Sequence, residues 1–237
     1  MNILHLYPDL MNLYGDSGNL RVLARRLEDQ GEEAVIDRLD PGQTPDFGKY
    51  GLIYMGPGTE RSQKAALEAL RPHADGLRAA MENGAHGLFT GNAASLLGRE
   101  VVDGDGKAWP GLGLLDFTAR ENKNERYTGD AIVRHSELDR PLVGFLNKCE
   151  VWEGSVTPLF QTVMGRGDFP GETGEGFVSH SFLGTHLIGP VLVKNPHFHN
   201  WLLKRLLGRD LKPVDYPNEE KAYQVTLQAL MERTGNG

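Results

Sequence analysis

Three loops of this sequence hold residue types that could do chemistry at the end of a strand. Residues 7–19 and 56–60 follow short apolar runs, and Thr90-Gly91-Asn92 is a sharp turn between an expected strand and an expected short helix. Many hydrolases hold a nucleophile in such a turn, where the helix N-terminus stabilises its anion. The apex here is Gly91, which adopts positive φ without steric cost but brings no nucleophile. The spacing is typical either of such a turn, a nucleophile elbow, that has lost its nucleophile, or of a plain strand-to-helix turn.

Cys149 is the only cysteine and the second candidate nucleophile. The neighbouring Lys148 could lower the pKa of its thiol, and His180 or His186 could approach it in the fold. The sequence around Cys149 does not have the pattern of a nucleophile elbow that would expose its side chain. This favours a partly buried free thiol without a catalytic role.

A pair of histidines, His197 and His199, raises the question of a metal site. On a helix opened by Pro196 they would point to different faces, because only positions three or four apart lie together. A helix that begins with Asn195 as its cap and Pro196 at its first position is the simpler interpretation. We therefore expect no metal site and no cofactor.

The elements that must position these residues alternate along the first hundred residues. Apolar runs at 3–6, 34–36, 51–55 and 86–90 predict strands, and the periodicity between them predicts helices, one of them broken near Pro72. This order predicts right-handed βαβ units on a parallel sheet with helices on both faces. Ligands bind such sheets beyond the carboxyl ends of the strands, where the three loops lie.

The rest of the chain is predicted to be richer in short strands. Runs at 117–120, 131–134 and 142–145 indicate strands, 187–193 a further buried strand, and 198–207 and 219–231 helices. No internal repeat is found, so we expect one domain over residues 1–237.

Composition excludes several classes of protein. The 25 Lys and Arg against 32 Asp and Glu give a net charge of −7, which argues against nucleic-acid or anionic-membrane binding. A single cysteine excludes disulfides within the chain and multi-cysteine metal clusters. No apolar run approaches the ~20 residues of a membrane span, and no basic leader opens the chain. We expect a soluble cytoplasmic protein.

Several motifs resemble the GatD family, glutamine amidotransferase subunits related to the cobyric-acid-synthase type. They are HLYPDLMNLYGDSGN at 5–19, GPGTERSQ at 56–63, LVGF at 142–145, GTHLIGP at 184–190 and KNP at 194–196. The resemblance implies a flavodoxin-like class I amidotransferase fold, with helices on both faces of an open parallel or mixed sheet. It also implies release of ammonia from glutamine to a MurT-like Mur ligase, which amidates the D-glutamate of lipid II.

The resemblance breaks at the residues that carry the family's chemistry. Placing the family's Cys-Gly-Gly-x-Gln motif on 91–95 puts the nucleophile at Gly91 and the glutamine at Ser95. The family's histidine falls on Ile188, and His186 stands where a tyrosine would be. Pro57, in the loop that resembles the oxyanion loop, has no N–H to donate. The resemblance therefore implies that the nucleophile and the histidine are lost.

Other positions of the family's site are kept or could still bind substrate. They are Gly56, Gly58, Asn92, Arg126 and His186. Arg126 opens a segment similar to one that faces the substrate in the family, and a guanidinium binds a carboxylate through two parallel hydrogen bonds. The alternative interpretation of Arg126 is a solvent-exposed charge.

Three hypotheses follow from the sequence. The first is a GatD-like subunit without glutaminase activity that docks a MurT-like partner. The second is a working glutaminase subunit, either because the family's motifs are placed differently on this sequence or because Cys149 substitutes for the nucleophile. The third is a sensor that binds glutamine or a related amino acid at the former glutamine site. Whether the chain is an enzyme stays open at this point.

Overall fold

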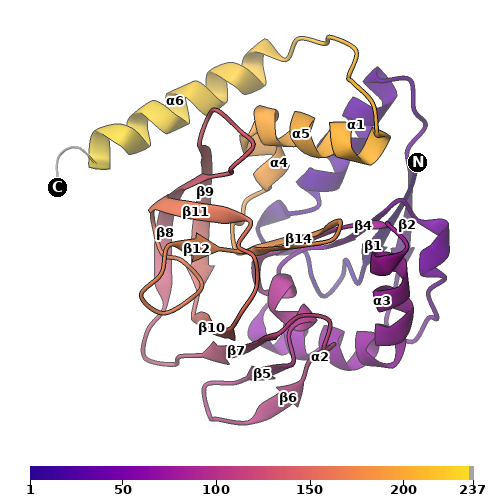
Figure 1. The fold of residues 1–237 in the computed structure, drawn as a ribbon, viewed down its shortest axis with the longest axis vertical. Helices are drawn as coiled ribbons and strands as arrows, with labels where there is room; N and C mark the ends of the chain where they lie inside the picture. The colour runs from indigo at the N-terminus through magenta and orange to yellow at the C-terminus, as the bar shows by residue number, and fades with distance from the viewer. Residues whose placement is uncertain (235–237) are drawn as a thin grey trace.

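A six-stranded sheet lies between two layers of helices in the computed structural model, which describes residues 1–234 (Figure 1). The strand order is β13-β14-β4-β3-β1-β2, and β13 alone runs antiparallel to its neighbour. These strands are β1 (Asn2–Leu6), β2 (Val35–Leu39), β3 (Leu52–Met55), β4 (His86–Thr90), β13 (Phe177–Ser179) and β14 (Phe182–Thr185). The predicted α/β class with an open, mostly parallel sheet is confirmed.

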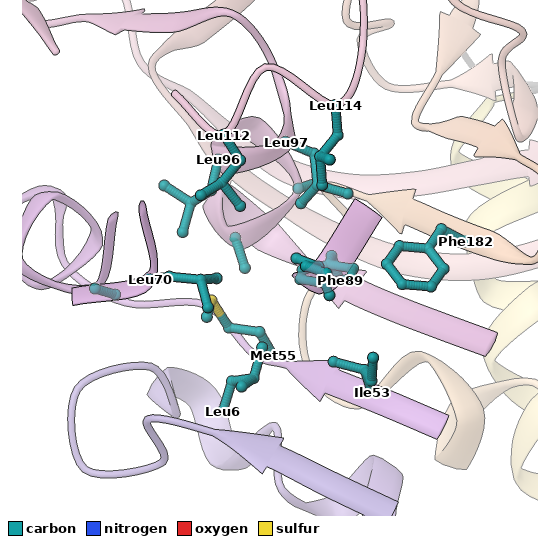
Figure 2. Packing of buried hydrophobic residues seen from close by; sticks show 14 of the residues in the cluster. Leu6, Ile53, Met55, Leu70, Phe89, Leu96, Leu97, Leu112, Leu114 and Phe182 are labelled. Atoms are coloured by element: carbon teal, nitrogen blue, oxygen red, sulfur yellow. The ribbon is translucent and has the colours of Figure 1, made fainter. Parts of the chain in front are cut away.

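The helices form two layers because successive strand residues point to opposite faces of the sheet. One layer holds α1 (Gly18–Asp29), α4 (Val191–Lys194) and α5 (Pro196–Leu207), and the other holds α2 (Glu60–Leu70) and α3 (Ala74–Glu82). Leu52 and Leu88 pack under α1 and α5, whereas Ile53 and Phe89 pack under α2 and α3. Figure 2 shows part of this second cluster, in which Phe89 faces Phe182 of β14.

Two four-stranded sheets and several short helical turns complete the fold. One sheet has the order β10-β7-β5-β6 and the other β12-β11-β8-β9. Their strands are β5 (Glu100–Val102), β6 (Ala108–Pro110), β7 (Phe117–Glu121), β8 (Tyr127–Arg134), β9 (Leu142–Lys148), β10 (Glu150–Gly154), β11 (Phe160–Met164) and β12 (Gly174–Glu175). Turns of 3₁₀ helix lie at Leu13–Gly15, Phe47–Lys49, Arg71–His73 and Gly91–Leu97.

Most of the predicted helices are present with similar bounds. The helix expected to break near Pro72 is α2 and α3, separated by the 3₁₀ turn, and Pro196 opens α5 as predicted. The last helix is α6 (Pro217–Thr234), which extends along the edge of the molecule beside β8 and β9. None of the helices in residues 1–234 has the length and apolarity to cross a bilayer. Residues 235–237 of the predicted domain lie outside the described part.

Two sequence-based predictions near the end of the family motif are wrong. Residues 187–193 do not form a strand, because Gly189 at φ 73° and Pro190 turn the chain into α4. The strand beside β4 is β14, which comes before that segment. Asn195 stands before α5 but does not cap it: its side chain bonds the backbone N–H and C=O of Val143, each at 2.8 Å.

Candidate functional site

A cavity of about 310 Å³ opens at the carboxyl edge of the central sheet. One side is built by the loops after β1, β3, β4 and β14, as the strand order predicts, and the other by β7 to β10. The predicted site residues that line it are Gly58, Gly91, Asn92, Arg126, Cys149, His186 and Ile188. Gly56 is not in the lining: a Cβ there would lie 3.0 Å from Met11 O, so this glycine serves close packing.

Gly91 stands at the apex of the turn after β4 with its backbone in the left-handed region, at φ 59°. A Cβ built on it would lie 2.5 Å from Pro57 Cβ and 3.2 Å from Ile188 Cγ2. The structure thus brings Gly91, Pro57 and Ile188, three of the positions at which the resemblance implies a departure from the family, into one place. Pro57 and Ile188 fill the space that a side chain at residue 91 would need.

The loop after β3 is tied to the turn after β4 by the side chain of Asn92. The Gly58 N–H donates to Asn92 Oδ1 at 2.9 Å, and Asn92 Nδ2 donates to Gly58 O at 3.0 Å. Gln63 Nε2 donates to Asn92 O at 2.8 Å. An oxyanion hole needs free N–H groups, but Pro57 has none and that of Gly58 is already bonded.

A buried carboxyl group lies beneath this turn. Asp16 is fully buried and its carboxylate accepts hydrogen bonds from the hydroxyls of Tyr54 and Thr90. Burial raises the pKa of Asp16, and the two hydroxyls and Asn19 oppose that rise. This network joins the loop after β1 to the ends of β3 and β4.

His186 lies in the cavity wall with a carboxylate on each side. Its Nε2 is 3.0 Å from Glu150 Oε1 and its Nδ1 is 2.8 Å from Asp168 Oδ1. Burial acts against a charged imidazole, but Asp168 and Glu150 outweigh it and raise the pKa of His186 to about 9. An imidazolium held in this way has no free lone pair, so it cannot act as a general base at neutral pH.

The acidic residues behind His186 form a buried ionic cluster with Lys148. Lys148 Nζ pairs with Asp168 and donates to Gly167 O at 2.7 Å. Glu175 accepts from the Thr185 hydroxyl at 2.9 Å, and burial raises its pKa to about 7. Asp168, Glu175 and His186 could each turn one ligand atom toward a common point. Lys148 and the imidazolium already pair with Asp168 and Glu150, so the cluster fits internal ion pairing rather than a metal site.

At the cavity mouth, Arg126 and Glu60 form a half-exposed ion pair. Arg126 also donates to Asn147 Oδ1 at 2.9 Å, and Asn147 Nδ2 donates to the Tyr14 hydroxyl at 2.8 Å. Although burial acts to raise the pKa of Glu60, its own backbone N–H and Arg126 hold it below the ordinary value. Arg126 therefore lies at the site, as the family resemblance implies, and a ligand can reach its side chain.

Cys149 lies beside this ion pair and away from any elbow. Its Sγ is 3.5 Å from Arg126 Nη2 and 3.7 Å from Glu60 Oε1, and neither His180 nor His186 is among its polar contacts within residues 1–234. Burial raises the pKa of the Cys149 thiol to about 11. The group is a neutral thiol at physiological pH.

Three residues of the site carried no signal in the sequence: Glu150, Asp168 and Glu175. Asp168 lies in a glycine-rich stretch that is typical of a solvated loop, and the other two sit in short strands. These strands belong to two different sheets and His186 follows a strand of the third, so only the packing of the three sheets brings the carboxylates to His186.

Comparison with known proteins fits this arrangement. A model of the CobB/CobQ-like glutamine amidotransferase domain matches residues 2–196. The chain belongs to the CobB/CobQ-like glutamine amidotransferase family. It is 29% identical over 232 residues to the lipid II isoglutaminyl synthase (glutamine-hydrolyzing) subunit GatD of Staphylococcus aureus, covering 96% of this chain and 95% of that one. It is 28% identical to the subunit of the same name from Streptococcus pneumoniae, covering 91% and 85%.

Solved structures of the amidotransferase class share the fold. A glutamine amidotransferase from Thermotoga maritima superimposes with a TM-score of 0.55 at 15% identity, covering 98% of this chain and 97% of that one. The family membership and the shared fold confirm the resemblance inferred from the motifs.

Proposed function

We propose that this protein is a GatD-like amidotransferase subunit of lipid II amidation that pairs with a MurT-like Mur ligase in the cytoplasm and has no glutaminase activity of its own. The two GatD relatives, matched over nearly the whole chain, support the pathway. The chain has a cavity at the edge of the sheet that a ligand can enter. The proposed lack of activity follows from the residues that line this cavity.

One observation carries the proposal: Pro57 and Ile188 pack against Gly91, the residue on which the family resemblance places the nucleophile. Amide hydrolysis by this family's route needs a thiolate to attack the carbonyl and an imidazole to transfer the proton. Glycine and isoleucine can do neither. The loop of Pro57 also lacks the donors that would stabilise a tetrahedral anion.

The alternative, in which Cys149 replaces the lost nucleophile, has less support. The thiolate is the nucleophilic form, and burial keeps Cys149 as the thiol. Its polar neighbours are a guanidinium and a carboxylate, neither of which is arranged as a Cys–His dyad. His186 is held between two carboxylates, away from this role.

The decisive experiment measures ammonia and glutamate release from glutamine. The chain is assayed alone and as the complex purified after co-expression with a MurT-like protein, beside Cys149→Ser and with the Staphylococcus aureus enzyme as positive control. We expect background rates from both preparations and no effect of Cys149→Ser. Glutamine-dependent ammonia release that is lost in Cys149→Ser would establish the working glutaminase instead.

Pairing is tested in the same preparation. The two proteins should elute together, and the complex should amidate lipid II when ammonium salts, but not glutamine, supply the nitrogen. Separate elution of the two proteins would remove the proposed partner.

A further inference from the structure

The loss of the family's dyad leaves the cavity with an apolar floor. Pro57 and Ile188 both lie against Gly91. Leu13 lies next to Pro57, because its N–H donates to Pro57 O at 2.9 Å. Ile188 is 3% exposed, and Pro57 and Gly91 are also buried. In this part of the cavity a ligand meets carbon atoms.

Several hydrogen-bond donors next to the floor are already paired. The Gly58 N–H donates to Asn92 Oδ1, Asn92 Nδ2 donates to Gly58 O, and Gln63 Nε2 donates to the backbone carbonyl of Asn92. A carboxamide seated here would give up its bonds to water and find these donors taken. Burying a polar group without a partner costs on the order of 1–3 kcal/mol in proteins, so the floor disfavours glutamine's side chain.

The mouth has the opposite character. Arg126 and Glu60 carry both signs of charge and pair with each other, with side chains 45% and 42% exposed. A zwitterion can take the place of both partners at once, so neither charge is left unpaired when this half-exposed pair opens. A guanidinium binds a carboxylate in a bidentate manner, and a carboxylate binds an ammonium group. An ion pair at the mouth above an apolar floor therefore complements a zwitterion that carries an apolar side chain.

We propose that the cavity binds a free aliphatic α-amino acid, with its side chain against Pro57, Gly91 and Ile188 and its charged groups at Arg126 and Glu60. This inference rests on the loss of the dyad in the proposed function. The volume of about 310 Å³ is at the small end of small-molecule sites, which suits a ligand of this size. Such a site would make the subunit responsive to amino-acid supply.

The test is isothermal titration calorimetry on the full-length chain with leucine and glutamine. Leucinamide, which lacks the carboxylate, and 4-methylpentanoate, which lacks the ammonium group, report on the two charged contacts. We expect saturable leucine binding, and glutamine, leucinamide and 4-methylpentanoate each weaker by about tenfold or more. The proposal would be overturned if glutamine bound as tightly as leucine, or if leucine showed no saturable binding up to about 10 mM.

Paired variants locate the ligand. Ile188→Thr makes the floor polar and should weaken leucine about tenfold, whereas Ile188→Val keeps it apolar and should change affinity less than about threefold. Arg126→Gln should weaken leucine binding about tenfold or more. The matched variant Arg120→Gln, which removes a surface ion pair with Glu153, should leave the affinity for leucine unchanged. Circular dichroism and unfolding curves confirm that each variant is folded. Unchanged leucine affinity in Ile188→Thr and Arg126→Gln would place the ligand elsewhere and refute the assignment.

The two proposals fail separately. Glutamine hydrolysis would contradict the inactive subunit and is read from ammonia release. The specificity of the cavity is read from binding heats, which require no turnover and no partner protein.

Discussion

Replacing Gly91 with cysteine should destabilise the protein for two separable reasons. Residue 91 has φ 59°, and a left-handed backbone costs a non-glycine residue about 1–2 kcal/mol. The new Cβ would also lie 2.5 Å from Pro57 Cβ, a contact that real structures avoid, and overpacking of a buried site costs about 1–3 kcal/mol more. We expect Gly91→Cys to lower the free energy of unfolding by about 2–5 kcal/mol in total.

A matched control separates the backbone cost from the clash. Gly113 has φ 63°, almost the same backbone, but a Cβ there would meet nothing within 4 Å. Gly113→Cys should therefore lose only the backbone part, about 1–2 kcal/mol. Urea denaturation under reducing conditions measures both variants. Equal losses at the two glycines would refute the idea that Pro57 blocks the elbow.

A double-mutant cycle with Pro57→Gly tests the contact directly. If Pro57 causes the clash, the Pro57→Gly/Gly91→Cys variant should be more stable than additivity predicts by about 1–3 kcal/mol. Adding Ile188→His to this pair should give more glutamine hydrolysis than Gly91→Cys with Ile188→His alone. Zero coupling energy would contradict the geometry, and full family-like activity without the change at Pro57 would show that the proline does not matter for catalysis.

Three further predictions concern the surroundings of the cavity. The folded state raises the pKa of His186 from 6.5 to about 9. The contribution of this residue to the free energy of unfolding should therefore be fully present below pH 6.5 and should be lost, by about 3 kcal/mol, as the pH rises through 9. Urea midpoints across this range measure the effect, and His186→Gln should flatten the curve. Asn92→Ala should cost about 1–3 kcal/mol of stability by freeing the bonds of Gly58, whereas Asn218→Ala on exposed α6 should cost almost nothing in the same denaturation assay. The Cys149 thiol, with its pKa raised from 9.0 to about 11, should react with a disulfide reagent about 100-fold more slowly at pH 7.5 in the native than in the unfolded chain; equal rates would contradict its burial.

The alternation of strands and helices in the first hundred residues was predictable because each element is locally complete. Runs such as 52–55 and 86–90 are apolar, short and bounded by glycine, so they indicate buried parallel strands. The site could be placed at the ends of these strands for the same reason. Local patterns did not predict β14. Leu187 and Ile188 form one apolar run with Val191–Val193, and this run hides the turn at Gly189.

The ionic cluster around His186 shows a different limit of sequence reasoning. Its acidic members are separated by up to 36 positions from the histidine, and charged residues in short polar runs ordinarily lie on the surface. Their burial is set by the packing of three sheets, to which β9, β10, β12 and β14 belong, and this tertiary arrangement has no local signature. Only the resulting compensation of charge makes these groups tolerable in the interior.

The way the cavity walls are joined bears on the proposed loss of glutaminase activity, because it shows what keeps the cavity open. Hydrogen bonds join the loops of one wall, from Leu13 to Pro57 and between Asn92 and Gly58, and a bond from Asn147 to Tyr14 joins that wall to the other. Tyr14 is held at φ 62°, a conformation that costs about 1–2 kcal/mol and lasts only where neighbouring contacts fix it. These bonds involve the backbone and side chains of the chain itself and require neither nucleophile nor substrate. The cavity therefore stays open whichever residues stand at 91 and 188, which is what the proposed function needs of a cavity that binds without catalysing.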